Sequence, residues 1–353
     1  MGGPGGSKKI NIAIQGGGAH GAFAWGILDK ILEDNRLDIE GICATSAGSM
    51  NAVAMAYGRM HGGYEGARQM LETFWKKISE VGATFSPIKT VPWDLFNTSW
   101  NQDFNPGFAL FETMTRLFSP YQFNPFNFNP LKNILDEVID FEVLKNCTRT
   151  KLYISTTKVR TGKVRVFKTS EMSLDVVLAS ACLPYLFQAV KVEGEYYWDG
   201  GYMGNPAIFP LLYHTESRDV LIVHINPMIR EELPTTSMDI MNRLNEITFN
   251  SSLLKEMREI ALLTRMIEDD WIKEEHKSKV KHMLMHSIRA DEMLKELSVA
   301  SKFNTDWGFL THLKELGREA GAKWIEENYD KVNNESSVNV RKQFLDLGVQ
   351  HVT

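Results

Sequence analysis

The 353-residue chain has few cysteines, no long apolar run and no excess of positive charge. Its three cysteines, Cys43, Cys147 and Cys182, lie in or beside apolar runs and form no C-x-x-C pair, so we expect buried thiols in a reducing compartment. No apolar segment approaches the roughly 18 residues of a membrane-spanning helix, so any membrane contact is expected to be peripheral. The formal net charge of -5 argues against an extended nucleic-acid surface. Metal-ligand spacings such as H-E-x-x-H are also missing, and we expect neither a metal nor a cofactor.

The distribution of apolar residues divides the chain into regions of different character. Residues 1–7 lack the apolar core of a signal peptide and are interpreted as a flexible tail or a cloning remnant, so a cytoplasmic location is expected. Residues 8–235 alternate strand-like and helix-like segments, which predicts an α/β domain with a mostly parallel sheet. Residues 236–332 carry Leu, Met and Ile at helical spacing and predict a helical extension, which is followed by a polar tail over 333–353.

Within the α/β region, residues 81–129 form an aromatic-rich insert that is broken by Asn-Pro steps. A stretch this long and apolar must cover another surface or be covered itself. One interpretation is a lid or acyl-chain wall over an active site. The other is packing on the core or a face for self-association, so a homo-oligomer remains open.

Two loops separated by one short helix carry the strongest functional signal. The first is the glycine loop of residues 16–21, and the second surrounds Ser46. Each loop follows an apolar strand-like run, over residues 10–14 and 39–43, and precedes a helix-like run. Both loops are therefore expected at the carboxyl edge of a parallel sheet, where α/β proteins bind their ligands.

Ser46 is expected on a tight strand-to-helix turn of the nucleophile-elbow kind, which lifts its hydroxyl clear of the sheet. Such a turn is crowded and needs small neighbours, which here are Ala44, Ala47 and Gly48. The structural alternative is a helix N-cap serine. The nearby glycine loop favours the nucleophile, because three adjacent glycines can expose N–H groups that stabilise an oxyanion.

The same loop matches the G-x-G-x-x-G pattern of dinucleotide sites through Gly16, Gly18 and Gly21. A dinucleotide site needs an acidic residue at the end of the second strand to hold the ribose. Here that strand ends in Ala44-Thr45-Ser46, so the sequence argues against nucleotide binding.

A nucleophilic serine requires a base, and the candidate is Asp199, which precedes Gly200 at the end of an extended aromatic segment. Glycine there allows a sharp turn that brings the carboxylate toward Ser46. An Asp-Gly hairpin turn is the structural alternative. A Ser-Asp-His triad would instead recruit His214 or His224, and both histidines are interpreted as structural.

Four linked motifs resemble those of the patatin-like phospholipases. They are the glycine loop, Ser46, the segment 179–184 with Phe187, and the pair Asp199-Gly200. The resemblance covers residues 8–225 and implies a three-layer α/β/α fold with a mostly parallel central sheet. The C-terminal extension resembles that of some bacterial members.

This resemblance implies a serine acyl hydrolase of lipid or fatty acyl esters that needs no metal or cofactor. Ser46 and Asp199 would act as a catalytic dyad without histidine. The amides of Gly16, Gly17 and Gly18 would form the oxyanion hole. The implied partner is a lipid or acyl ester, with peripheral contact at a membrane or lipid surface left open.

Two positions depart from the family pattern. His20 stands where the family usually has Arg or Lys, and Ala44 stands where its elbow usually begins with glycine. His20 would change how the loop is anchored or make an anion contact pH-dependent. Ala44 adds a methyl group to a crowded turn. These departures leave open a lipid-binding or scaffolding protein with weak or no catalysis. The Ser, Asp, His order along the chain leaves open a histidine-assisted esterase.

Overall fold

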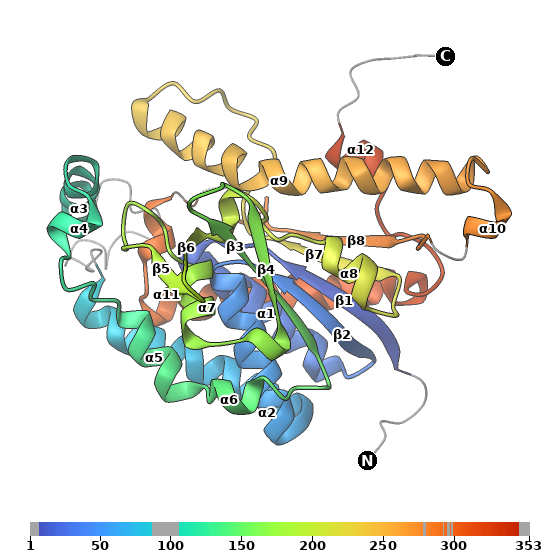
Figure 1. Cartoon of the computed structure of the whole chain (residues 1–353), viewed down its shortest axis with the longest axis horizontal. Coiled ribbons are helices and arrows are strands. Elements are labelled where there is room, and N and C mark those ends of the chain that lie inside the picture. The colour runs from blue at the N-terminus through green and yellow to red at the C-terminus, as the bar shows by residue number, and fades with distance from the viewer. Residues whose placement is uncertain are drawn as a thin grey trace.

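The computed structural model describes residues 7–86, 106–277, 280–291, 293–294, 297 and 299–345. Most of the N-terminal tail, the middle of the aromatic insert and the end of the polar tail lie outside the described residues. The described chain forms three layers, with helices on both faces of a central sheet (Figure 1). The three-layer α/β/α fold indicated by the sequence is confirmed.

The central sheet has the strand order β5-β6-β3-β2-β1-β7-β8, and β4 pairs with β3 beside this path. Neighbours from β3 through β8 along this order are parallel, whereas the β3–β4, β3–β6 and β5–β6 pairs are antiparallel. Successive side chains of β1 enter opposite cores, Ile12 and Ile14 on one face and Ala13 on the other. The strands are β1 (Lys8–Ile14), β2 (Leu37–Ala44), β3 (Lys151–Lys158), β4 (Val164–Lys168), β5 (Val190–Val192), β6 (Glu195–Asp199), β7 (Asp219–His224) and β8 (Leu284–Arg289).

The helices that cover the two faces enclose separate hydrophobic cores. The larger core lies under α1 (Gly21–Asp34), α2 (Ala47–Phe85), α5 (Pro130–Val138), α6 (Phe141–Leu144), α7 (Leu174–Ser180) and α11 (Trp307–Asn328). The other lies under α8 (Phe209–His214), α9 (Ser237–Glu268) and α12 (Val340–Phe344). Figure 1 shows α9 and α12 on one side of the sheet and α1, α2 and α5 on the other.

The α2 helix is not continuous, since its path breaks at Gly62 and Gly63. Gly63 has a φ of 62°, which favours glycine. The described part of the aromatic insert contains α3 (Pro106–Leu117) and α4 (Pro120–Phe123). Phe108 and Phe111 of α3 pack against Phe303, which is distant in sequence.

The C-terminal region is only partly helical. The helices α9, α10 (Glu274–Lys277) and α11 agree with the predicted helical extension, but residues 284–289 form β8 and pair in parallel with β7. The expectation of helix there is wrong because β8 is covered on both faces. The strand reads Leu-Met-His-Ser-Ile-Arg, and its polar side chains are buried or half-buried among the apolar ones, so its sequence lacks the regular alternation of a strand with one exposed face. The domain boundary at residue 235 stays a prediction. The region beyond it contributes β8 to the same sheet as the residues before it.

The α11 helix packs directly on α1. A Cβ at Gly26 would lie 1.9 Å from the Lys314 carbonyl oxygen, and a Cβ at Gly317 would lie 2.0 Å from the Phe23 carbonyl oxygen. The two glycines therefore permit a close approach of the two backbones. This contact brings the segment just before α11 toward the glycine loop, which lies just before α1.

Candidate active site

Ser46 lies on a sharp turn between the end of β2 and the start of α2. Its backbone has a φ of 55° and a ψ of −125°, a strained conformation for a residue other than glycine. A Cβ at Gly48 would lie 2.6 Å from the Ile14 carbonyl oxygen, which explains the glycine at that position. Ala44 is fully buried, and its methyl group is part of the larger core. The local structure therefore has the geometry that the sequence predicts for an elbow.

The segment that follows α7 supports this turn. The Ser46 N–H donates to Ser180 Oγ at 2.9 Å, and the Ser180 hydroxyl donates to the Ser155 carbonyl oxygen at 2.8 Å. This bond occupies the Ser46 amide. The sequence analysis included Ser180 in a family motif but assigned it no contact.

The glycine loop lies directly beside Ser46. A Cβ at Gly16 would be 2.6 Å from Ser46 Cβ, so any side chain at Gly16 would displace the serine. The Gly16 N–H donates to Asn205 Oδ1 at 2.7 Å. Within the described chain, the amides of Gly17 and Gly18 have no protein acceptor. They are therefore the loop donors that remain available for a ligand.

Asp199 lies at the end of β6 and is fully buried. Its Oδ1 accepts the Gly201 N–H at 2.7 Å. A Cβ at Gly200 would lie 2.1 Å from the Ser155 carbonyl oxygen, so the sharp turn after the aspartate requires glycine. The aspartate caps a short 3-10 helix over Gly200–Tyr202 and does not form the Asp-Gly hairpin turn of the structural alternative.

The environment of Asp199 perturbs its acidity strongly. Burial raises the pKa of the carboxyl from 3.8 to about 7, although the Gly201 amide, the Ser46 hydroxyl and the charge of Lys302 all lower it. The second oxygen, Oδ2, has no partner that meets strict hydrogen-bond geometry among the described residues. The Ser46 hydroxyl is nevertheless one of the groups that lower the pKa of this carboxyl.

Neither candidate histidine takes part in this cluster. His214 is exposed at the end of α8, and its carbonyl oxygen accepts from Lys151 at the start of β3, whereas Ser46 follows the end of β2. His224 is buried against the Phe344 ring, and burial lowers its pKa to about 3. The groups that act on the pKa of Asp199 include no histidine.

His20 anchors the glycine loop from its C-terminal side. The side chain is buried, and its Nε2 lies 2.7 Å from Ser301 Oγ. Burial and the nearby charges of Lys302 and Arg230 hold the His20 pKa well below 6.5, so the ring is neutral at pH 7. The structure supports the first effect expected of His20, a changed anchoring of the glycine loop. It gives no basis for the second, a contact between a charged His20 ring and an anion.

Several residues of the site carry no local sequence signal. Asn205 follows the Asp-Gly turn by a few positions and reaches the Gly16 amide. Gln15 precedes the loop, and its Oε1 accepts the backbone N–H groups of Ile225 and Asn226 at 2.9 and 3.0 Å. Lys302 comes from the C-terminal region. Asn205 and Gln15 adjoin predicted motifs, but nothing in the local sequence predicts the contacts that they make.

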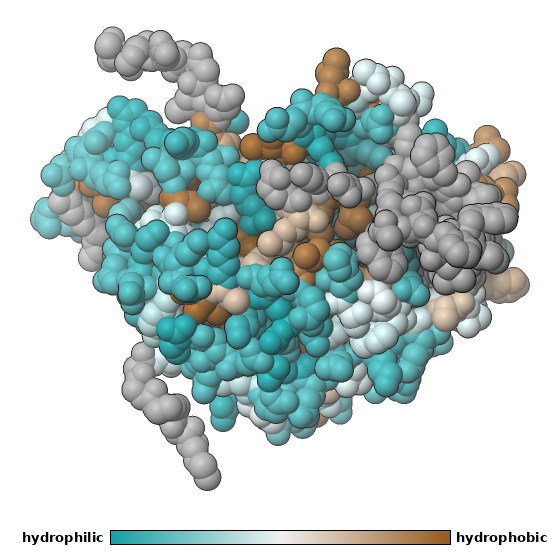
Figure 2. Space-filling view, turned by 180° about the vertical axis from the view of Figure 1, so that it is seen from behind, coloured by the Kyte–Doolittle hydropathy of each residue, from teal (hydrophilic) through white to brown (hydrophobic). Residues whose placement is uncertain are grey.

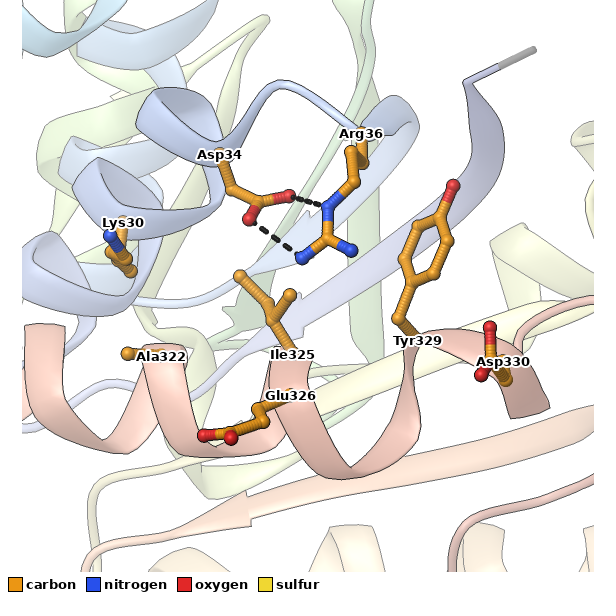
Figure 3. A pocket seen from close by; sticks show the side chains of 8 residues that line it. All are labelled: Lys30, Asp34, Arg36, Ala322, Ile325, Glu326, Tyr329 and Asp330. Carbon is orange, nitrogen blue, oxygen red and sulfur yellow. Dashed lines mark hydrogen bonds and ion pairs between the residues drawn. The ribbon is translucent and has the colours of Figure 1, made fainter. Parts of the chain in front are cut away.

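A polar cavity of about 270 Å³ lies elsewhere in the molecule (Figure 3). It is formed by α1, the turn between α1 and β2, and α11 with the residues that follow it, and Asp34 and Arg36 on its wall form an ion pair with each other at 2.7 Å. Arg36 precedes β2, whereas Ser46 follows it, so the cavity and Ser46 lie at opposite ends of that strand. This cavity is not part of the candidate active site.

The patatin-like phospholipase family model matches residues 12–212, which is more than half of the chain. The chain belongs to the patatin-like phospholipase family. The match includes the glycine loop, Ser46 and Asp199, and it places this patatin-like chain in a family of lipid hydrolases. Comparison with curated protein sequences found no match.

Solved structures similar to this patatin-like chain include two bacterial proteins. VipD from Legionella pneumophila is 13% identical, with a TM-score of 0.41 over 96% of this chain and 73% of VipD. ExoU in the ExoU-SpcU complex from Pseudomonas aeruginosa is 14% identical, with a TM-score of 0.39 over 92% of this chain and 52% of the other. The patatin-like chain therefore spans about half the length of ExoU.

Metal-binding and membrane-spanning features are both missing from the described part of the patatin-like chain. Over the described ranges, no three His, Cys, Asp or Glu side chains gather as a metal site. Among the helices described, none is long and apolar enough to cross a bilayer.

Proposed function

We propose that this chain is a serine acyl hydrolase in which Ser46 is the nucleophile and Asp199 is its general base. The observation that carries the proposal is the buried Asp199 carboxyl. Its Oδ2 is left without a well-formed hydrogen bond among the described residues, and the Ser46 hydroxyl of the elbow lowers its pKa. The Gly16 backbone is in contact with the same serine. A base, a nucleophile and a loop with available N–H donors are the components that acyl transfer requires.

The proposed reaction begins when Asp199 accepts the proton of the Ser46 hydroxyl and Ser46 Oγ attacks the ester carbonyl carbon. The carbonyl oxygen becomes an oxyanion, which the Gly17 and Gly18 amides stabilise together with the positive end of the α2 dipole. Collapse of this intermediate breaks the bond to the alcohol, which leaves with the proton from Asp199. Water, deprotonated by Asp199, then attacks the acyl-enzyme; the bond to Ser46 Oγ breaks, Asp199 returns the proton to Ser46, and the fatty acid is released.

The raised pKa of Asp199 suits this role. A base is most efficient when its pKa lies near the working pH, and burial brings the pKa of Asp199 to about 7. A carboxyl with the ordinary pKa of 3.8 would be a much weaker base. Activity is therefore expected to rise with pH through neutrality.

We also propose a lipid or fatty acyl ester as the substrate, with contact at a lipid surface. The described part of the aromatic insert exposes large apolar side chains, namely Leu110, Leu117, Phe118, Tyr121, Phe126 and Phe128. The N-terminal half of α9 exposes Ile240, Met241, Leu244 and Ile247. Figure 1 places α3, α4 and this half of α9 at the same end of the molecule, and Figure 2 shows apolar patches at that edge from behind.

The insert is also bonded to the segment between α7 and β5. The Ala189 N–H donates to the Tyr121 hydroxyl oxygen at 3.3 Å, and the Gln188 side chain donates to the Asn124 carbonyl oxygen at 3.0 Å. A cavity of about 270 Å³ next to these contacts is lined by residues that include Asn127, Leu178 and Phe187. These contacts support the interpretation of the insert as a wall for the acyl chain.

The test is hydrolysis of a short neutral acyl ester by wild type and Ser46→Ala. The Ser46→Ala variant is expected to lose activity by several orders of magnitude, because the proposed acyl-enzyme forms on the Ser46 hydroxyl. Ser251→Ala is the matched control, since Ser251 is exposed on α9 and bonds only to its own helix. Undiminished turnover by Ser46→Ala would refute the proposal. A wild type without activity would favour lipid binding without catalysis.

A further inference from the structure

Lys302 lies along the glycine loop although it follows the loop by almost the whole length of the chain. Its carbonyl oxygen would be 2.5 Å from a Cβ at Gly18, and its own Cβ would be 3.2 Å from it. At the other end of the side chain, Nζ donates to Asn226 Oδ1 at 2.8 Å. Asn226 Nδ2 in turn donates to the Gly16 carbonyl oxygen at 2.8 Å. The lysine therefore extends from Gly18 toward Gly16, which touches Ser46.

The Lys302 ammonium also lies near the Asp199 turn. Its Nζ is 5.8 Å from the centroid of the Phe249 ring. A Cβ at Gly201 would lie 2.3 Å from that ring, and the Gly201 N–H holds Asp199. The charge of Lys302 lowers the pKa of Asp199, and the charge of Asp199 raises the pKa of Lys302. The ammonium is thus electrically coupled to the proposed base.

Burial dominates the acidity of Lys302 and lowers its pKa to about 8. Three other charged groups face it: Asp199 from β6, Glu246 from α9, and Arg230 from the segment after β7. Glu246 is already paired with Arg230 at 2.6 Å and with Arg243 at 3.0 Å. Over the described residues, Lys302 forms no ion pair within 4 Å, so its charge has no carboxylate partner in direct contact.

The segment that carries the lysine is held at both sides. Ser301 Oγ lies 2.7 Å from the buried His20 Nε2, and the Phe303 carbonyl oxygen accepts the Ser86 hydroxyl at 2.9 Å. Asp306 caps α11 by accepting the Phe309 N–H at 3.0 Å. A long flexible side chain is therefore attached to a fixed backbone, which favours a defined position for its charge.

We propose that Lys302 is an electrostatic positioning residue of the active centre, whose ammonium stabilises the negative charge on Asp199 and on the oxyanion that forms at the glycine loop. During attack by Ser46, negative charge moves from the carboxylate to the substrate oxygen. A fixed cation that acts on both positions stabilises the charge at both ends of this transfer. The proposal rests on the proposed function.

The test compares Lys302→Met, Lys302→Arg and the wild type by kcat and KM for a neutral short-chain ester between pH 5.5 and 10. A neutral ester excludes any contribution from recognition of a charged head group. Lys302→Met is expected to lower kcat by about 10- to 100-fold with little change in KM. Lys302→Arg keeps the charge and is expected to retain most of the activity.

The pH profile separates a charge effect from a structural one. Wild-type kcat/KM is expected to rise as Asp199 ionises, with a pKa of about 7, and to fall as Lys302 loses its proton, with a pKa of about 8. Lys302→Met removes the alkaline fall and moves the acidic rise to higher pH, because the cation that lowers the pKa of Asp199 is gone. Lys302→Arg moves the alkaline fall beyond the range, since arginine stays charged.

Thermal unfolding of each variant checks that it folds, and Lys323→Gln on the exposed face of α11 is the control for loss of a lysine charge. A Lys302→Met protein with wild-type kcat and an unchanged profile would overturn the inference. A folded Lys302→Arg as inactive as Lys302→Met would also overturn it. Ser46→Ala in the same assay separates the two proposals: if it is inactive while Lys302→Met is normal, only the inference on Lys302 fails.

Discussion

Replacement of the buried Asp199 by asparagine is expected to change stability in a way that depends on pH. Folding raises the pKa of this carboxyl from 3.8 to about 7, mainly through burial. The folded state therefore binds the proton more tightly than the unfolded state. The stabilisation from this proton is complete below pH 3.8 and is lost as the pH rises through about 7. An asparagine side chain does not titrate, so the variant escapes this loss.

The magnitude follows from the pKa shift. At pH 5 the carboxyl is ionised in the unfolded chain but protonated in the folded protein. This pH lies about two units below the pKa of about 7 in the folded state. Each unit corresponds to about 1.4 kcal/mol, so between pH 5 and 8.5 the wild type loses about 3 kcal/mol that Asp199→Asn does not lose. A new amide N–H without an acceptor destabilises the variant equally at both pH values. This cost cancels in the difference.

The assay is urea unfolding of the wild type and Asp199→Asn at pH 5 and pH 8.5. The control is Asp136→Asn, because Asp136 is exposed on α5. The stability of Asp199→Asn relative to the wild type is expected to increase from pH 5 to 8.5, while the control shows no such trend. An equal difference at both pH values would refute the assignment of a raised pKa to Asp199.

Three further predictions concern the loop, its anchor and the apolar end of the molecule. Gly18→Ala is expected to lower ester turnover by about 100-fold, because Gly18 has a φ of 58° and a methyl group there would lie 2.5 Å from the Lys302 carbonyl oxygen. The control Gly162→Ala has a φ of 66° but nothing within 4 Å, and equal loss of turnover in both would contradict the role of the loop. Ser301→Ala leaves the buried His20 Nε2 without its partner and is expected to lower the free energy of unfolding by about 1–3 kcal/mol. If urea unfolding gives Ser301→Ala the same free energy of unfolding as the exposed-site control Ser251→Ala, the role of Ser301 as an anchor is contradicted. The double substitution Leu117→Ser and Phe126→Ser, at side chains 70% and 95% exposed, is expected to weaken sedimentation with phospholipid vesicles while leaving soluble-ester turnover unchanged. Unchanged vesicle binding would argue against this surface as the lipid contact.

The sequence predicted those parts of the site that depend on short-range patterns. Glycines and small residues around Ser46, and glycine after Asp199, report the local backbone requirements of two sharp turns, and the structure contains both turns. The β1 and α1 segments were predictable because their apolar periodicity continues over several residues.

Long-range contacts had no such local signal. The acceptor of the Gly16 amide is Asn205, and the cation along the loop is Lys302, neither of which is adjacent to the loop in sequence. The edge strand β8 was missed because burial on both faces removes the alternation that identifies a strand. Tertiary pairing, which local periodicity does not encode, determines these three features.

Labelling with a fluorophosphonate, followed by mass mapping, tests the central claim most directly. Such reagents modify an activated serine, so the proposed mechanism predicts one adduct on Ser46. Its rate should increase from pH 6 to 8 as Asp199 ionises, with a pKa of about 7. Asp199→Asn should label at least about 100-fold more slowly, because the serine loses its base. An adduct on another serine, or wild-type labelling of Ser46 in Asp199→Asn, would contradict the Ser46–Asp199 dyad.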